Sequence, residues 1–406
     1  MTKNIALDHP WLDRSPLLLL DGYRFSERRR RDAEDVTPTR VAGARALIVR
    51  GAEAAAWFYG DEALRRRDAV PGLVAQPLFG PGAVHTLDGE HHAVRKHWFV
   101  DVLDAEAVRA SSARLGTAWR EEVSGWDGEV DVFERASAVL TRVAVERAGL
   151  AVDPRGWEPL RRDLVAMVDG VGAVAGPRHQ RARAARARTQ AWVVDQVRAA
   201  RHGTEASGLV RAVADLRDED GRQVADEVAA TELLNVVRPQ VAVAWLVAGG
   251  ARALDEHPAL RSALADGTLS PIDVAQEVRR TTPFVPLLAA RAGRDTRWGD
   301  VKVPAGTLVV LDVWGTDHDP RSWARPDVFD PLRYARERVT AVNLVPQGGG
   351  SRERGHRCPG EDLTLAYLSV MLPELARSGA VVHEGTVSLR RMPPRPQCRA
   401  RVEQRR

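Results

Sequence analysis

The glycine-rich segment around Cys358 restricts the possible folds of this chain more than any other stretch. Gln-Gly-Gly-Gly at 347–350 precedes it, and Gly-His-Arg-Cys-Pro-Gly-Glu at 355–361 contains it. The apolar spacing at 363–372 predicts a helix directly afterwards. Glycines let the backbone approach another group closely, and nearby basic side chains with a helix start favour a thiolate. These residues leave three interpretations open: a redox cysteine, a structural cysteine or a metal ligand.

The small number of cysteines limits which metal Cys358 can bind and indicates the cellular compartment of the protein. One cysteine without partner ligands does not make a zinc site, whereas a single thiolate suits a haem iron, which brings four nitrogens of its own. The other cysteine, Cys398, matches no motif. Two cysteines in 406 residues cannot form a disulfide framework, which indicates a reducing compartment. We therefore expect a cytoplasmic protein.

Apolar periodicity predicts a mainly α-helical chain. Residues 105–119, 132–150, 157–174 and 189–201 have helical spacing, and the arginine-rich stretch 178–188 is interpreted as a solvated helix face or loop. Strand patterns are few, at 46–50, 284–291 and 307–313, and the Pro, Asp and Arg spacing at 316–339 predicts an ordered meander. No linker or composition shift marks a boundary. We therefore predict a single domain over 1–406, with a large helical portion and a small β-rich portion.

The distribution of charge argues against a nucleic-acid partner, and the hydropathy argues against insertion into a membrane. The chain has 59 basic and 55 acidic residues, and acidic residues are interspersed among the basic ones, so we expect no nucleic-acid binding. No basic segment followed by a sustained apolar run is present near the N-terminus. The longest apolar stretch, 233–248, is short for a bilayer and contains Arg238 and Pro239. We expect no membrane insertion.

Three motifs in this order resemble the cytochrome P-450 family. Glu277 and Arg280 match its Glu-x-x-Arg helix, Arg333 matches the meander arginine that joins this pair, and Cys358-Pro359-Gly360 matches its Cys-x-Gly haem loop. The resemblance implies the cytochrome P-450 fold and haem b, with Cys358 as the axial ligand of the iron. It implies a structural role for Glu277, Arg280 and Arg333.

Two departures from the common family pattern restrict the chemistry. Ser351 stands where most members have a Phe seven residues before the cysteine. Most members also have an acid and an alcohol side by side in the long central helix, where they deliver protons to iron-bound dioxygen. Here Ala248-Gly249-Gly250 is followed by Ala251 and Arg252, and the earlier part of the helix contains Arg238-Pro239 instead.

Arg238 is the most informative residue of that helix. The surrounding residues are apolar nearly all round, which predicts burial, and a buried guanidinium needs an anion because an unpaired one costs several kcal/mol. One interpretation is an internal salt bridge, for example with Glu232. Pro239 donates no backbone hydrogen bond, so the carbonyl of Asn235 loses its usual donor and we expect a distorted helix there.

An Arg-Pro pair at this place resembles the bacterial fatty-acid peroxygenases and olefin-forming decarboxylases of the family. The loop 78–89 and the stretches 277–286, 315–320 and 345–350 resemble that branch as well. The resemblance implies catalytic roles for Arg238 and Pro239. It implies substrate contacts from Arg238, Leu78, Phe79 and Val171. It implies haem-propionate contacts from His92, Arg95, Lys96 and His356.

The same resemblance implies a mechanism in which the substrate replaces the missing acid. A fatty-acid carboxylate held by Arg238 above the haem acts as general acid and base for hydrogen peroxide. Oxidation then occurs near the carboxyl end, and gives α- or β-hydroxy acids or terminal alkenes. A redox partner protein is not required.

His85 bears on the choice between these products. Hydroxylating members of the branch tend to have Gln here, whereas the decarboxylating type has His, with a Phe at the position of Phe79. By itself, a His in a loop is usually an ordinary polar residue. With the resemblance we expect a catalytic His85 in the distal pocket. Its unperturbed pKa of about 6.5 would make the product ratio depend on pH.

Two other functions compete with the peroxygenase. One is a conventional monooxygenase that receives electrons from a redox partner, and the missing acid–alcohol pair argues against it. The other is a haem sensor or carrier without turnover, and a buried arginine that awaits an acidic substrate argues against that.

Overall fold

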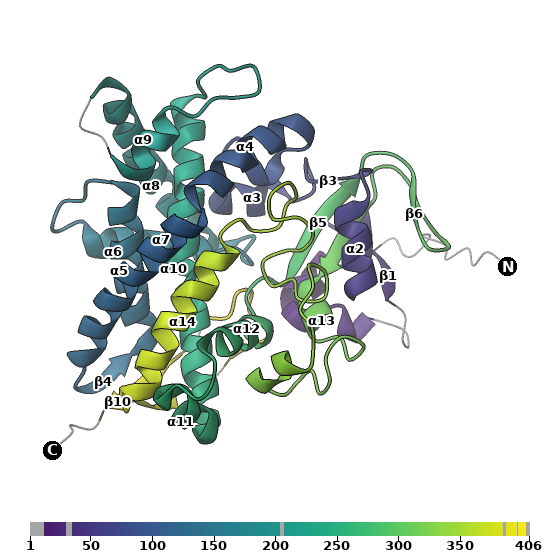
Figure 1. The fold of residues 1–406 in the computed structure, drawn as a ribbon. Helices are drawn as coiled ribbons and strands as arrows, with labels where there is room; N and C mark the ends of the chain where they lie inside the picture. Colours follow the sequence, from purple (N-terminus) through teal and green to yellow (C-terminus); the bar gives the residue numbers. More distant parts are fainter. Residues whose placement is uncertain (1–11, 30–34, 204–206, 385–386, 396, 403–406) are drawn as a thin grey trace.

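The computed structural model describes residues 12–29, 35–203, 207–384, 387–395 and 397–402. A helical part and a smaller β-rich part lie side by side, and strands β1 and β2 near the start of the described chain belong to the β-rich part (Figure 1). Helices predominate, and the strands form three small sheets. The structure therefore has the predicted proportions of helix and strand.

The helices cover most of the described chain. They are α1 (Ser15–Asp21), α2 (Ala52–Gly60), α3 (Gly72–Leu78), α4 (Gly89–Val102), α5 (Ala105–Ser124), α6 (Val132–Ala148), α7 (Trp157–Asp169), α8 (Gly176–His202), α9 (Gly208–Ala214), α10 (Asp226–Glu256), α11 (Pro258–Asp266), α12 (Pro271–Thr281), α13 (Val313–Asp317) and α14 (Glu361–Arg377). Short 3-10 helices span Gly22–Arg24, Glu27–Arg29, Val84–Thr86 and Pro331–Ala335.

The largest sheet has five strands in the order β1-β2-β8-β5-β3. Its centre is the parallel pair β2 and β8, in which Ala46 is opposite Leu308, and β5 runs antiparallel to β8. The strands are β1 (Val36–Val41), β2 (Ala44–Val49), β3 (Leu64–Arg65), β4 (Gly128–Asp131), β5 (Leu287–Ala292), β6 (Thr296–Trp298), β7 (Val301–Val303), β8 (Leu308–Asp312), β9 (Val381–Glu384) and β10 (Arg399–Val402). A three-stranded sheet has the order β4-β10-β9, and β6 pairs with β7.

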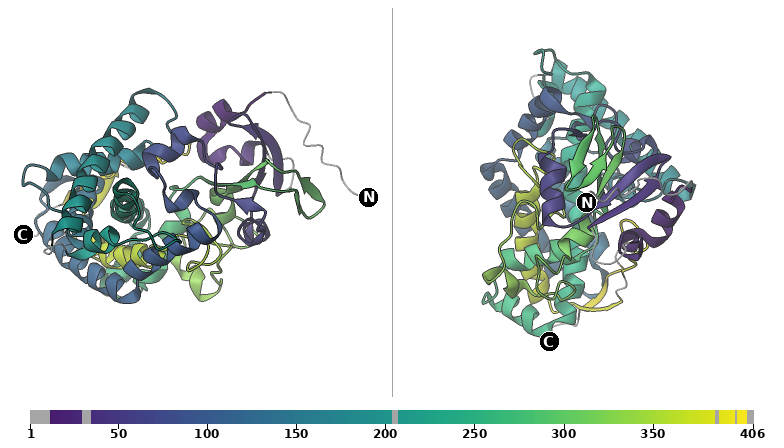
Figure 2. Two further views of the ribbon diagram at one scale, coloured as in Figure 1. Left: turned by 90° about the horizontal axis from the view of Figure 1, so that it is seen from above. Right: turned by 90° about the vertical axis from the view of Figure 1, so that its right-hand side faces the viewer.

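Helix α10 lies in the centre of the helical part, where α6, α8 and α14 pack around it (Figure 2). Its length and hydropathy are those of a membrane-spanning helix, but 89% of its 18-residue apolar stretch is buried inside the protein. Burial of this kind is typical of the core helix of a large domain. The apolar stretch is therefore accounted for by packing within the chain.

The predicted elements are found with shifted ends. Helices α5, α6 and α7 begin where the periodicity predicts. Strand β8 lies within its predicted segment, β5 extends one residue beyond its segment, and β2 begins two residues before its segment. The prediction for 178–188 was incomplete. These residues form part of α8, and its Arg186 is buried rather than solvated.

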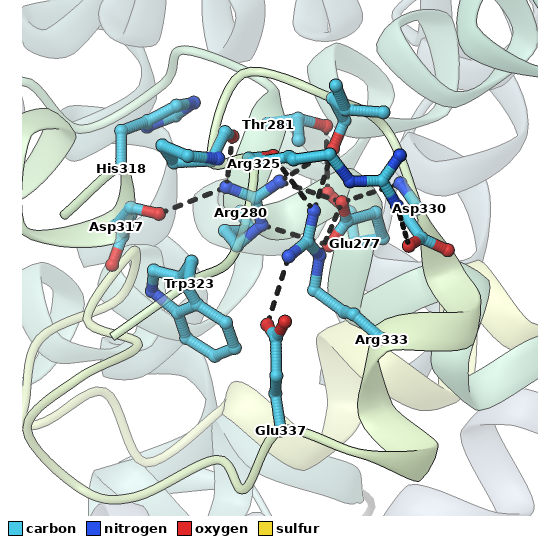
Figure 3. Close-up of polar contacts among 12 residues, drawn as sticks. Glu277, Arg280, Thr281, Asp317, His318, Trp323, Arg325, Asp330, Arg333 and Glu337 are labelled. Carbon is cyan, nitrogen blue, oxygen red and sulfur yellow. Dashed lines mark hydrogen bonds and ion pairs between the residues drawn. The ribbon is translucent and has the colours of Figure 1, made fainter. Parts of the chain in front are cut away.

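A buried cluster of charges fixes the meander to α12 (Figure 3). Glu277 is 0% exposed and accepts five hydrogen bonds: two from Arg280, and one each from the Arg333 side chain, the Tyr334 hydroxyl and the backbone N–H of Asp330. The structure thus brings together, in one buried cluster, the three residues that the family resemblance grouped.

Glu277→Gln should destabilise the protein by about 3–5 kcal/mol, because it removes the only charge that neutralises Arg280 among the described residues. Urea unfolding of the haem-bound protein measures this loss. The matched control is Glu256→Gln, which breaks an exposed pair with Arg252 on α10 and should change the free energy of unfolding by less than about 1 kcal/mol. Equal effects of the two substitutions would contradict the structural role.

Candidate haem and substrate site

The loop of Cys358 is held between the meander and the start of α14. The backbone N–H of Cys358 donates to the carbonyl of Gln347 at 2.9 Å, and the Gln347 amide nitrogen lies 3.7 Å from Sγ. Behind the loop, the buried Arg279 donates to the Gln347 side chain at 2.9 Å and to Glu361, the first residue of α14, at 2.6 Å. Helix α12 therefore positions both sides of the cysteine loop.

The protein alone does not favour the thiolate of Cys358. Burial raises the pKa of this thiol, although the backbone N–H of Gly360 and the charge of Lys96 act in the opposite direction. Among the described residues, no group of three or more His, Cys, Asp or Glu side chains is placed to hold a metal ion. A metal at Cys358 must therefore bring its other ligands with it, as a haem iron does.

A cluster of basic side chains lies next to this loop. Lys96 on α4 donates to the carbonyl of Arg357 at 2.5 Å, and the rings of His92 and His356 are 3.9 Å apart. The guanidinium of Arg66 is buried over the Phe58 ring at 4.3 Å. Lys96, His92 and Arg66 have no carboxylate within ion-pair distance among the residues that the structure describes, which fits a group with two carboxylates such as haem b.

Burial controls the protonation of this cluster. Burial lowers the pKa of Lys96 to about 8, although the nearby Cys358 acts to raise it. Burial lowers the pKa of His92 to about 4. It lowers the pKa of His356 as well. At neutral pH the two histidines are neutral hydrogen-bonding groups, and the positive charge comes from Lys96 and Arg66. Arg66 was not predicted from the sequence, because it follows no motif.

Arg95 has a partner within the protein, which the sequence did not predict. Its guanidinium donates to Glu232 on α10 at 2.8 Å, and both side chains are buried. Glu232 also accepts the backbone N–H of Val84 at 2.8 Å and the Asn235 amide at 3.3 Å. A propionate contact from Arg95 stays a prediction, but its charge is already balanced by Glu232.

This arrangement leaves Arg238 without a carboxylate. Its side chain is buried, with 4% of the residue exposed, and the structure gives it no hydrogen bond or ion pair with any described residue. Burial, and then the charge of Arg186, lower the pKa of Arg238 to about 9, so it stays charged at neutral pH. The internal salt bridge with Glu232 is not formed. The guanidinium is available for an anion from outside the chain.

Pro239 lies within a continuous helix. Helix α10 runs from Asp226 to Glu256 without a break, and the side chain of Gln240 donates to the carbonyl of Val236 at 3.0 Å. Pro239 is exposed although every other residue at 229–248 is buried. Because α10 is the central helix, this accessible surface borders an internal space next to Arg238.

His85 and Phe79 form a stacked pair at the same space. Their ring centroids are 4.3 Å apart with an interplanar angle of 12°, and the Phe79 carbonyl accepts the Asn235 amide at 3.0 Å. Burial, and then the charge of Arg238, lower the pKa of His85 to about 3. Part of the ring is accessible, but the protein surrounds it, so it faces the interior rather than bulk water. The expectation that its charge changes near pH 6.5 is wrong.

The two remaining predicted substrate contacts lie at the ends of helices. Leu78 is the last residue of α3, directly before Phe79, and is partly buried. Val171 lies between α7 and α8, where its N–H donates to the Val168 carbonyl at 3.2 Å. Their contact with a substrate stays a prediction.

A single cysteine in a glycine-rich loop, a basic cluster beside it and a charged arginine in an apolar core helix are the features expected of a haem-thiolate protein. Residues 273–378 match the family model "Cytochrome P450". Among sequence relatives, abscisic acid 8'-hydroxylase 1 of Oryza sativa is 22% identical over 381 residues, which is 87% of this chain and 79% of the relative.

Solved structures give a higher similarity. Cytochrome P450SP alpha (CYP152B1) in complex with (R)-ibuprophen is 34% identical, with a TM-score of 0.90 over 96% of this chain and 98% of the other. Cytochrome P450EX alpha (CYP152N1) with myristic acid is 31% identical, with a TM-score of 0.90 over 97% of both chains. Ligand-free cytochrome P450 OleT is 28% identical, with a TM-score of 0.88 over 98% of this chain and 99% of the other. The chain belongs to the cytochrome P450 family, in its CYP152 branch, and haem is the cofactor of this family.

Cys358→Ala should abolish the red-shifted Soret band that a thiolate ligand gives to the ferrous carbon monoxide complex, because no second thiolate lies near the loop. Absorption spectroscopy of the haem-bound protein measures it. The control is Cys398→Ala, since Cys398 is buried elsewhere and should leave the band unchanged. A thiolate band that persists without Cys358 would overturn the assignment of the ligand.

Proposed function

We propose that this chain is a hydrogen-peroxide-dependent peroxygenase that oxidises fatty acids near the carboxyl end. The observation that carries the proposal is Arg238, a buried guanidinium that has no anion among the described residues. A bidentate carboxylate is the partner that best fits a guanidinium in an apolar site. The CYP152N1 relative was solved with myristic acid, which supports a fatty acid as the source of this carboxylate.

In this proposal the protein positions the substrate, and the substrate itself supplies the acid. Arg238 binds the carboxylate beside Pro239, and the apolar residues of α10 exclude bulk water. The carboxylate accepts a proton from one oxygen of hydrogen peroxide and returns it to the other, as a general base and then a general acid. Haem held by the thiolate of Cys358 would supply the oxidising chemistry of this family.

The products follow from where the chain of the fatty acid lies. A carboxylate fixed by Arg238 would keep Cα and Cβ at the reacting end of the substrate. Two-electron oxidation by hydrogen peroxide then either places a hydroxyl on Cα or Cβ, with water as the second product, or removes a hydrogen from Cβ together with the carboxylate as carbon dioxide, which gives a terminal alkene and two molecules of water. His85 is neutral and stacked on Phe79, so it acts as a fixed hydrogen-bonding group rather than as a charged one. No redox partner is needed in this scheme, and a cytoplasmic location remains part of the proposal.

Arg238→Ala should nearly abolish peroxide-driven turnover of a fatty acid, with a loss of about 2–5 kcal/mol of transition-state stabilisation. Arg238→Lys should restore little, because an ammonium group lacks the fork that binds both carboxylate oxygens. Product formation with hydrogen peroxide alone measures these effects. Arg252→Ala on the same helix is the control, and should keep the normal rate.

The same assay separates the competing functions. A conventional monooxygenase would give product only with an electron donor, and a sensor would give none under either condition. Normal turnover by Arg238→Ala would contradict the proposed role of the carboxylate.

His85→Gln should preserve turnover and lower the ratio of alkene to hydroxy acid, because glutamine has a similar reach but a different geometry. A twofold change in the ratio corresponds to about 0.4 kcal/mol. Since the pKa of His85 is about 3, protonation occurs only in strong acid, and the ratio should not change between pH 6 and 8 through this residue. Gas chromatography of the products across pH measures both effects.

The control for this substitution is His97→Gln, which changes an exposed histidine of α4. An unchanged product ratio in His85→Gln would exclude His85 from the choice between products. A ratio that changes near pH 6.5 in the wild type but not in His85→Gln would contradict its neutral state.

A further inference from the structure

A second arginine is buried beside Arg238, on α8. Arg186 is 6% exposed, and its guanidinium donates only to neutral oxygens: Gln190 Oε1 at 2.7 Å and Thr231 Oγ1 at 3.3 Å. Its Nε and Nη1 atoms are buried without a hydrogen-bond partner. Like Arg238, it has no carboxylate within ion-pair distance among the described residues. An unpaired buried guanidinium is costly, so its presence indicates an absent anion.

Arg186 reaches from α8 to the side of α10 that carries Arg238. Thr231, which contacts Arg186, precedes Arg238 by seven residues, which is two helical turns or roughly 10 Å along the axis. Side chains on a helix slant towards its N-terminus, so Arg238 extends back towards Thr231 and shortens this gap. The charge of Arg186 lowers the pKa of both Arg238 and His85, which agrees with a shared space.

The backbone also makes room for Arg186. Gly80 follows Phe79 directly, and a Cβ at Gly80 would lie 1.9 Å from Nη2 of Arg186. Gly80 has a φ of +85°, a conformation that glycine adopts readily. The loop that contains the stacked pair of Phe79 and His85 therefore closes directly over this guanidinium.

The charges around this space do not balance. Arg95, Arg186 and Arg238 supply three positive charges, and Lys96 of the cluster beside the cysteine loop is counted apart from them although it also acts on His85. Glu232, which acts on both Arg95 and Arg186, supplies one negative charge, and His85 is neutral. Glu232 is occupied by Arg95, by the N–H of Val84 and by Asn235. Within the described part of the chain the site thus has an excess of two positive charges. A single fatty-acid carboxylate neutralises one of them.

We propose that Arg186 is a second anion-binding group of the substrate site, and that the site binds long-chain amphiphiles with a dianionic head group more tightly than those with one charge. The inference rests on the proposed function, because it takes Arg238 as the first anion-binding group. An alkyl phosphonate has the chemistry required: its oxygens accept from both guanidiniums, and its second charge neutralises Arg186. A monocarboxylate leaves that charge unpaired.

The test compares the binding of dodecanoate, dodecylsulfonate and dodecylphosphonate to the haem-bound protein. The pH lies above the second pKa of the phosphonate and below the pKa of Arg238, which is about 9, so that both the ligand and the arginine are charged. The sulfonate and phosphonate have the same chain and a tetrahedral head group, so the ratio of their affinities isolates the second charge. Isothermal titration calorimetry should show a preference of about tenfold or more for the phosphonate in the wild type. Equal binding of the two would overturn the proposal.

Substitutions then assign the preference to a residue. Arg186→Gln should reduce it to within about twofold, whereas Arg183→Gln, which changes an exposed arginine of the same helix, should leave it intact. If Arg186→Gln fails to bind haem, Arg186→Lys replaces it and should lower the preference, because the fork is lost but the charge is kept. An undiminished preference in whichever variant binds haem would overturn the proposal.

Arg238→Gln distinguishes this inference from the proposed function. It should weaken all three ligands, since it removes the shared anion-binding group. Normal dodecanoate affinity in Arg238→Gln would contradict the proposed function itself. Weaker dodecanoate binding, together with a phosphonate preference that does not depend on Arg186, would contradict only the role of Arg186.

Discussion

The buried charges of one turn of α12 hold together the parts of the molecule that carry the chemistry. Glu277 and Arg280 fix the meander, while Arg279 binds Gln347 and Glu361 on the two sides of the cysteine loop. All three side chains are essentially inaccessible, and each charge is satisfied inside the protein. The position of the sulfur is therefore set by polar contacts from behind the loop, and the loop itself is rich in glycine.

Around Arg238 on α10, by contrast, the buried charges are not balanced inside the protein. Arg238 and Arg186 are buried with unsatisfied N–H groups, and the one carboxylate nearby, Glu232, is committed to Arg95. A protein retains such groups at a cost in stability where a ligand completes them. Charges that are balanced inside the protein, as on α12, therefore indicate a structural cluster. Charges that are not balanced, as on α10, indicate a binding site.

Much of the fold could be predicted from the sequence, because long helices with one apolar face have a clear period, as in α5 and α6. Cys358 was recognisable because it ends a series of three motifs that resemble a known family, and Arg238 because it stands alone in an apolar helix. Arg186 was not, since one arginine among many on α8 gives no signal until packing shows which side faces inward. The pairing of Arg95 with Glu232 and the neutral state of His85 depend on residues far apart in the chain, and periodicity carries no information about them.

The unpaired guanidinium of Arg238 links substrate concentration to the folding equilibrium. An anion that binds the folded chain and not the unfolded one stabilises it by an amount that grows with the logarithm of its concentration, about 2.7 kcal/mol at a hundred times the dissociation constant. An anion bound at Arg238 should therefore raise the resistance of the protein to heat and to proteolysis.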